Sequence, residues 1–173
     1  MPGTRKLGRT TAHRKALLRN LVSQVVLNGK VETTLAKAKE VKPLLDSLVD
    51  LAIAEKDNFE MVEKTVSRAK VENGKKVKET KTSKNGTKYE VVVREVVKEE
   101  VKNDKPSKLA ARRKMFNMLN KIKDEKGNTI DLTEKLFEEI APKYEAKNGG
   151  YSRIIRLVAR KGDGAERAII ELI

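Results

Sequence analysis

Apolar side chains recur at helical spacing in the first thirty residues of the chain. The pattern predicts a helix that begins at Thr10 or Thr11, since either hydroxyl can accept a hydrogen bond from the opening turn, and that ends at Gly29. The apolar side of this helix carries Leu17, Leu18, Leu21, Val22, Val25 and Val26, with Asn20, Ser23 and Gln24 on the opposite side. Such a stripe indicates packing against a core rather than a ligand site.

A strand and a second helix follow. Alternating Val31, Thr33 and Leu35 predict the short strand. Pro43 lies inside the helical pattern after it, and proline removes a backbone donor, so we expect Pro43 to end or kink the first part of that helix. The apolar residues of the second helix are Val41, Leu44, Leu45, Leu48, Val49 and Ala52.

Two further helices are predicted in the last third of the chain. One begins after Pro106-Ser107, and the other begins at Asp131, where Glu134 completes a capping arrangement, and stops at Pro142. Their apolar residues are Leu109, Phe116 and Leu119 in the first, and Leu132, Leu136, Phe137 and Ile140 in the second.

The C-terminus reads as a β-hairpin. Two β-rich runs, 151–160 and 166–172, flank a turn at Gly162–Gly164, and we expect Leu157 and Ile170 among the buried residues. The predicted fold is therefore α+β: a two-layer domain with helices packed on a small three-stranded sheet.

The middle of the chain differs in composition from both flanks. Residues 56–108 carry thirteen lysines and only two arginines, and Asn73-Gly74 and Asn85-Gly86 separate short runs in a manner typical of hairpins. We expect a Lys-rich β-hairpin insertion with two or three strands over 64–98. The predicted organisation is a basic N-terminal arm at 1–12, a core at 13–55 and 107–173, and an inserted β excursion at 56–106.

Charge points to the class of partner. The chain has 39 basic and 25 acidic residues, a formal net charge of +14, and no cysteine. This excess of positive charge makes nucleic acid the leading partner. A membrane surface is the natural competitor, but no segment is apolar enough to cross a membrane, and no metal or other cofactor is expected. The lone His13 cannot build a histidine metal cluster, and the absence of cysteine fits the reducing cytoplasm.

The strongest basic signal lies at the N-terminus, where the first 31 residues contain no acidic side chain. Cations in the first turn of a helix oppose the helix dipole, so their presence favours a bound phosphate there. The same argument applies near the start of the second helix. The candidate contacts in these two regions are Arg5, Lys6, Arg9, His13, Arg14, Lys15 and Arg19, then Lys37 and Lys39.

Several strings resemble one known family in order and spacing. KLGRTTAHRKALLRNL, KVETTLAKAKEVKPLLDSLVDLA and LFEEIAPKYEAKNGGYSRIIRLVARKGDGAERAIIELI resemble the bacterial large-subunit ribosomal protein family numbered seventeen. The resemblance covers residues 5–55 and 109–173 and leaves the insertion outside. It implies an α/β core, a structural role in the cytoplasmic ribosome, binding to 23S ribosomal RNA near the nascent-chain exit, and neighbouring large-subunit proteins as further partners.

Further candidate RNA contacts each have a plainer alternative. Gly149, Gly150 and Tyr151 form either a turn whose tyrosine caps the sheet or a close backbone approach to RNA, and both can hold. Arg153 and Arg156 fall on opposite faces of a strand, so they cannot share one partner. These two, with Arg112 and Arg113, are either solvated or in contact with phosphate.

Two other classes of function fit the sequence poorly. Carboxylate pairs such as Glu99-Glu100 and Glu138-Glu139 lie on polar stretches without the apolar pocket that would separate their pKa values, so neither an enzyme nor a small-molecule substrate is expected. A DNA-binding protein would need a helix-turn-helix or a zipper, and neither pattern is found. In the insertion, lysine and glutamate mix in a manner typical of solvated decoration.

Overall fold

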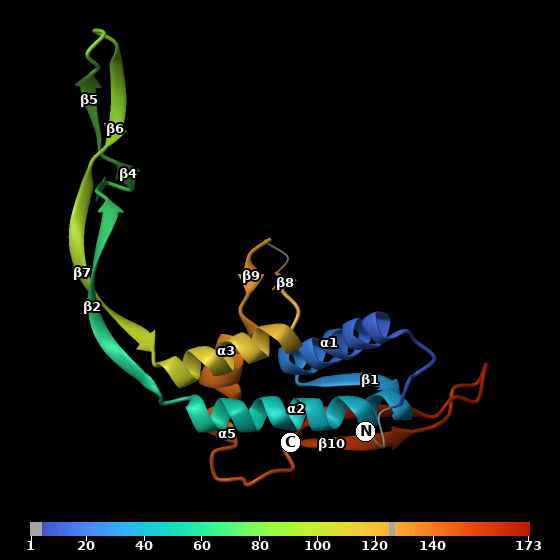
Figure 1. The fold of residues 1–173 in the computed structure, drawn as a ribbon. Coiled ribbons are helices and arrows are strands. Elements are labelled where there is room, and N and C mark those ends of the chain that lie inside the picture. Colours follow the sequence, from blue (N-terminus) through green and yellow to red (C-terminus); the bar gives the residue numbers. More distant parts are fainter. Residues whose placement is uncertain (1–4, 125–126) are drawn as a thin grey trace. The chain divides into compact units, whose positions relative to one another are not determined.

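The structure is a computed structural model that describes residues 5–124 and 127–173. The described chain divides into two compact units. The core unit runs up to Asn58 and resumes at Lys105, and the excursion unit spans Phe59–Asp104 (Figure 1). Helices and small antiparallel sheets together build the protein, so the α+β class is correct.

Helix α1 (Thr11–Asn28) has the predicted bounds. Thr10 is the N-cap residue, although its side chain makes no capping hydrogen bond. Gly29 ends the helix in the left-handed conformation at φ 77°, and its N–H donates to the Val25 carbonyl at 2.8 Å. The expectation that Ser23 faces solvent is wrong: Ser23 is fully buried, because hydrogen bonds satisfy its hydroxyl.

Strand β1 (Lys30–Thr34) leads directly into helix α2 (Leu35–Glu55). Leu35 was expected in the strand but begins the helix. The expectation that Pro43 ends or kinks α2 is also wrong, because the helix continues through it. Val41 and Leu45 on either side of the proline are fully buried, and this packing holds the backbone helical despite the missing donor.

Helix α3 (Pro106–Met118) begins where predicted but buries a different face. Leu109 and Phe116 are 38% and 47% exposed, so their assignment to the core is wrong. Ala111 and Met115 are buried instead. The small alanine lets the helix pack closely, and the flexible methionine fills the space beside it.

The segment after α3 contains a small hairpin that was not predicted and a composite helix. Asp131 caps that helix as expected, with one carboxylate oxygen accepting from the N–H groups of Thr133 at 2.9 Å and Glu134 at 3.3 Å. The helix does not stop at Pro142, because proline fits the first turn of its last part. The elements are β8 (Ile122–Lys123), β9 (Thr129–Ile130), α4 (Leu132–Lys135), the π-helical turn η1 (Leu136–Ile140) and α5 (Ala141–Lys143).

Strands β10 (Ser152–Leu157) and β11 (Arg167–Leu172) complete an antiparallel sheet in the order β1-β11-β10. Helix α2 contacts all three strands. Ile170 of the central strand is fully buried, as expected. Leu157 is only partly buried, and the expectation of a core position is wrong, because Leu157 ends its strand opposite the charged Arg167.

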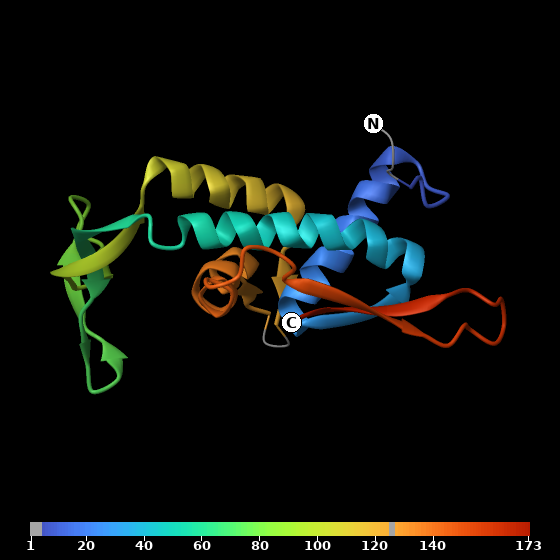
Figure 2. The ribbon, with the colours of Figure 1, turned by 90° about the horizontal axis from the view of Figure 1, so that it is seen from below.

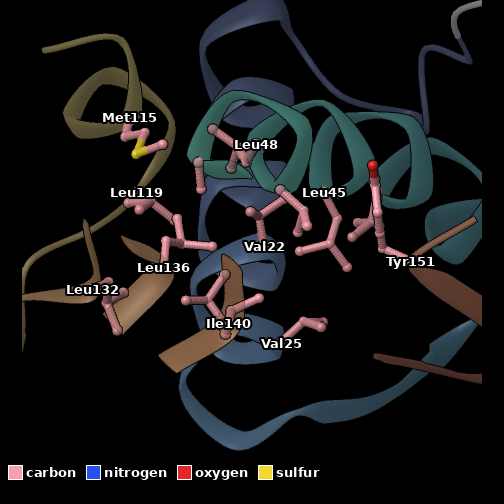
Figure 3. Packing of buried hydrophobic residues seen from close by; sticks show 14 of the residues in the cluster. Val22, Val25, Leu45, Leu48, Met115, Leu119, Leu132, Leu136, Ile140 and Tyr151 are labelled. Atoms are coloured by element: carbon pink, nitrogen blue, oxygen red, sulfur yellow. The ribbon is translucent and has the colours of Figure 1, made fainter. Parts of the chain in front are cut away.

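The hydrophobic core gathers side chains from every helix of the core unit. Figure 3 shows Val22 and Val25 of α1 close to Leu45 and Leu48 of α2, with Leu136 and Ile140 of η1 approaching from the opposite side. Met115 and Leu119 close the core near the end of α3. The core therefore fixes the starts of α1, α2 and β11, where the candidate site described below lies.

The excursion unit contains six strands joined by turns, so the expectation of two or three strands over 64–98 is wrong in number and in extent. Strands β2 and β7 form a long ribbon, and Asn73-Gly74 and Asn85-Gly86 lie in the turns of two shorter hairpins beyond it. None of its residues is buried. Its strands are β2 (Phe59–Ala69), β3 (Val71–Glu72), β4 (Lys75–Lys76), β5 (Lys78–Thr82), β6 (Lys88–Val92) and β7 (Arg94–Asp104).

Candidate nucleic-acid interface

Residues 1–4 of the predicted N-terminal arm lie outside the described residues, and the described part of the arm contacts helix α2 through Arg5. A guanidinium nitrogen of Arg5 contacts a carboxylate oxygen of Glu40 at 2.7 Å. The chain then turns at Leu7 and Gly8, both with positive φ, and the Arg9 N–H donates to the Lys6 carbonyl at 3.1 Å. Arg5 is thus tied to the protein, while the side chains of Lys6 and Arg9 are exposed without an ion pair among residues 5–124 and 127–173.

The start of α1 combines free amide groups with cations. The first turn has no acidic residue and no side-chain cap. His13 and Lys15 are exposed and Arg14 is half-buried, and none of the three has an ion pair within the described part of the chain. An anion placed there would meet unpaired N–H groups, the positive end of the helix dipole and nearby positive charge together.

A hollow of about 310 Å³ lies at the start of α2 and is lined by Glu32, Thr33, Thr34, Lys37, Arg160 and Arg167. Arg167 pairs with Glu32 at 2.9 Å, and Arg160 pairs with Asp163 at 3.1 Å. Lys37 has no ion pair among the described residues. The first turn of α2 also lacks an acidic residue and a side-chain cap, so the hollow has the chemistry of an anion site.

These features lie toward one end of the core unit. The Leu35 N–H donates to the Glu166 carbonyl at 3.0 Å, which joins the start of α2 to the C-terminal hairpin. In both ribbon views the arm, the start of α2 and the turn between β10 and β11 point the same way (Figures 1 and 2). We call this surface the basic end. Its residues are Arg5, Lys6, Arg9, His13, Arg14, Lys15, Lys37, Lys39, Arg160, Lys161 and Arg167.

Most acidic side chains near the basic end form ion pairs with arginines of the same chain. Glu40, Glu32 and Asp163 are each paired with an arginine, as described above, and the side chain of Glu166 remains exposed. The unpaired lysines therefore leave the basic end with a surplus of positive charge.

Sequence reasoning did not place Lys161 and Arg167 in the site. They reach the basic end because the hairpin folds back beside α2, and the only sequence signal is the Lys161–Gly164 turn flanked by arginines.

Two predicted contacts have structural partners instead. Arg19 donates to the carbonyls of Leu119 at 3.0 Å and Phe116 at 3.4 Å, and so holds the end of α3. Its Nε is buried without a hydrogen-bond partner among the described residues. Arg112 donates to Glu134 at 2.7 Å and stacks over a core phenylalanine. Both guanidinium groups hold elements of the core unit together.

The other predicted arginines differ in availability. Arg153 pairs with Glu171 at 2.5 Å across β10 and β11. Arg156 and Arg113 are exposed and have no ion pair in the described ranges. Arg113 lies on α3 and is not among the residues that define the basic end. Only some of the predicted residues are thus brought together on one surface.

The glycine pair at 149–150 precedes a buried tyrosine. Tyr151 is only 2% exposed, and its hydroxyl donates to an Asp50 carboxylate oxygen at 2.6 Å. That hydrogen bond raises the pKa of Tyr151 above its ordinary value. Because the ring is inside the core, it cannot stack on a base, and the interpretation of Tyr151 as a cap of the sheet is favoured. Gly149 and Gly150 have φ 130° and 67° and open space around them.

The fold and the charge distribution of the core unit together indicate a class of protein. An α+β core that gathers unpaired cations at one end is typical of proteins that bind nucleic acid. Over the described ranges, none of the helices combines the length and apolar character needed to cross a membrane.

Comparison with known proteins identifies the family. Residues 17–173 match the family described as Ribosomal protein L17, and the chain belongs to this family. It is similar to the large ribosomal subunit protein bL17 of Acetivibrio thermocellus, with 51% identity over 100% of both chains. It is also similar to the bL17 proteins of Lachnospira eligens, at 45% over 98% of each chain, and of Staphylococcus carnosus, at 33% over 99% of each.

Membership of this family makes the chain a structural component of the large ribosomal subunit in the cytoplasm rather than an enzyme. One expectation is corrected by the alignment. The excursion was expected to fall outside the family resemblance, yet the Acetivibrio thermocellus protein aligns with the whole chain, the excursion included.

Proposed function

We propose that the chain binds 23S ribosomal RNA in the large subunit, near the nascent-chain exit, and neutralises RNA phosphates with the basic end. The observation that carries the proposal is that lysines without ion pairs gather there while most neighbouring carboxylates are paired internally. The place near the exit is drawn from the family resemblance. Neighbouring large-subunit proteins are the second kind of partner in this proposal.

The starts of α1 and α2 supply the phosphate contacts in this proposal. Neither first turn has an acidic residue or a side-chain cap, although the Leu35 N–H of α2 already donates to the Glu166 carbonyl. Arg14 and Lys15 flank the first of these turns, and Lys37 and Lys39 flank the second. A phosphate bound at either turn would relieve the unfavourable placement of cations near a helix N-terminus.

The other predicted contacts contribute less to RNA binding in this proposal. Arg156 and Arg113 are available for phosphates beyond the basic end, while Arg5 and Arg153 would have to exchange internal carboxylate partners for RNA. Gly149 and Gly150 would let the backbone approach RNA closely, since neither has a Cβ and the space around both is open. Arg19, Arg112 and Tyr151 would support the core from within.

The proposal is tested by the salt dependence of binding to a 23S ribosomal RNA transcript. Arg14→Gln with Lys15→Gln should lower the slope of log affinity against log salt by about 0.7–0.9 for each phosphate that the variant no longer neutralises. A matched double variant, Lys64→Gln with Lys98→Gln, removes the same charge from the excursion unit and should keep the wild-type slope. Equal slopes for both variants and the wild type would contradict the proposal.

A further inference from the structure

The part of the excursion between β2 and β7 forms a branched tip, residues 70–93. Two hairpins meet there, β3–β4 and β5–β6. Backbone hydrogen bonds close the junction: the Lys70 N–H donates to the Val93 carbonyl, the Val77 N–H to the Lys70 carbonyl, and the Val93 N–H to the Val77 carbonyl, at 2.8–2.9 Å. The tip is therefore a defined structure within the excursion unit, visible as two diverging hairpins in Figure 1.

Charge is divided unevenly between the tip and the ribbon. The β2–β7 ribbon carries five basic and six acidic side chains, whereas the tip carries seven lysines and three glutamates. The positive charge of the excursion unit therefore lies in its tip. The tip therefore carries a formal net charge of +4 and the ribbon one of −1.

Ion pairs within the tip leave most of its lysines without a partner. Glu72 pairs with Lys70 at 2.9 Å, and Glu90 pairs with Lys78 at 2.7 Å. The third glutamate, Glu79, is exposed on the same face as Lys81. Five exposed lysines have no ion pair within the described chain: Lys75, Lys76, Lys81, Lys84 and Lys88.

An exposed aromatic ring accompanies these lysines. Tyr89 lies directly opposite Lys81 in the β5–β6 pairing and is 49% exposed. The two other tyrosines of the chain, Tyr144 and Tyr151, are buried in the core unit. An aromatic face beside unpaired cations is the arrangement that binds unpaired bases, with the ring stacking on a base and the lysines meeting its phosphates.

We propose that the tip is a second RNA-binding site, separate from the basic end, that takes a single-stranded or loop segment of RNA on Tyr89 and the five unpaired lysines. An acidic protein surface would satisfy the lysines but gives no reason for the exposed ring. This inference rests on the proposed function, because it adds a site to the same RNA-binding protein.

The first test measures the electrostatic contribution of the tip. In the full-length protein, Lys84→Gln with Lys88→Gln should lower the salt slope for a 23S ribosomal RNA transcript by about 0.7 for each phosphate left without its lysine. Lys64→Gln with Lys98→Gln, on the ribbon, is the control with an equal charge change. Arg14→Gln with Lys15→Gln, at the basic end, should lower the slope independently, so that the combined variant shows the sum.

The second test reports contact at the ring itself. The chain has no tryptophan, so Tyr89→Trp introduces a single fluorescent probe at the tip. Its emission should be quenched when the 23S transcript is added. Met61→Trp, at a ribbon position that is 55% exposed, is the matched control and should keep its emission.

The outcomes separate this inference from the proposed function. A wild-type slope for Lys84→Gln with Lys88→Gln, or no quenching of Tyr89→Trp, overturns the second site while the basic end can still bind. Quenching by large-subunit proteins but not by the transcript would assign the tip to a protein partner and also overturn it. If the wild-type protein fails to bind the transcript at all, the proposed function itself is wrong.

Discussion

Single polar side chains in the core unit have partners that their local sequence does not reveal. Ser23 joins α1 to the end of α3, since its hydroxyl donates to the Arg19 carbonyl at 2.7 Å and accepts from the Asn120 N–H at 2.8 Å. Arg19 also lies on α1, and its guanidinium group donates to the carbonyls of Phe116 and Leu119 at the end of α3. The two residues connect elements about a hundred positions apart, so their roles are structural.

The hydroxyl of Ser23 should therefore matter for stability. Ser23→Ala leaves the Asn120 N–H without its partner in a partly buried place, and we expect the free energy of unfolding to fall by about 1–3 kcal/mol. Urea denaturation followed by circular dichroism measures the change. Ser47→Ala, at an exposed position of α2, is the control and should change stability by less than about 0.5 kcal/mol.

Tyr151 should make stability depend on alkaline pH. Its hydrogen bond to Asp50 raises the pKa of the hydroxyl in the folded protein. A raised folded pKa contributes stability below the unfolded pKa of about 10, and this contribution is lost as pH rises through the folded value. Tyr151→Phe should therefore be less stable than the wild type at pH 7, and the difference should shrink above pH 10.

The measurement is urea unfolding at a series of pH values. Tyr89→Phe is the control, because that side chain is half exposed in the excursion unit, and its profile should follow the wild type. A constant difference between Tyr151→Phe and the wild type from pH 7 to pH 11 would contradict the prediction.

At the scale of elements, local signals set where helices begin and end. Gly29 and Asp131 act as predicted, because a left-handed glycine and a capping carboxylate work through neighbouring backbone atoms. Hydrogen bonds from Thr133 and Glu134, helped by the charge of Arg112, outweigh the effect of burial and lower the pKa of Asp131. Pro43 fails as a local signal because contacts distant in sequence hold α2 on both sides of it.

Burial along the C-terminal strands predicts different costs for two similar substitutions. Ile170→Asp would place a charge at a fully buried position of the central strand and should unfold the core unit, at a cost of several kcal/mol. Leu157→Asp, at the partly buried end of β10, should lower stability by less and leave a folded protein. Circular dichroism and thermal unfolding distinguish the two, and equal loss of structure in both would contradict this assignment of burial.

At the scale of the whole molecule, the excursion unit is attached where the core chain nearly closes on itself. The Lys105 N–H donates to the Asn58 carbonyl at 3.2 Å, so the two ends that flank the excursion are adjacent. None of the residues of the excursion unit is buried, and all the buried residues of the described core come from the core unit. The core unit should therefore fold without the excursion.

Replacing residues 60–104 with a short Gly/Ser linker tests this expectation. The shortened protein should keep the helical circular dichroism of the core and still enter large subunits, because loop length affects closure weakly, by about 0.6 kcal/mol for each doubling. Its affinity for the 23S transcript should fall by the contribution of the tip alone. A shortened protein that does not fold would show that the excursion belongs to the core.

The sequence by itself determined the helices, the final strands, the two Asn-Gly turns and the family. These features follow from periodicity, capping and turn residues, and from strings of neighbouring residues, all of which act over a few positions. Cation-rich helix starts were also found in this way, because the helix dipole is a local property.

Only the tertiary structure decided which face of α3 is buried, why Pro43 is tolerated, and which cations remain free. Leu109 and Phe116 look like core residues in sequence, but α3 packs through Ala111 and Met115. Folding brings Glu40, Glu134 and Glu171 beside Arg5, Arg112 and Arg153, so these three predicted RNA contacts have partners within the chain that the sequence did not reveal. Packing and ion pairing depend on residues far apart in the chain, and their distances exist only after folding.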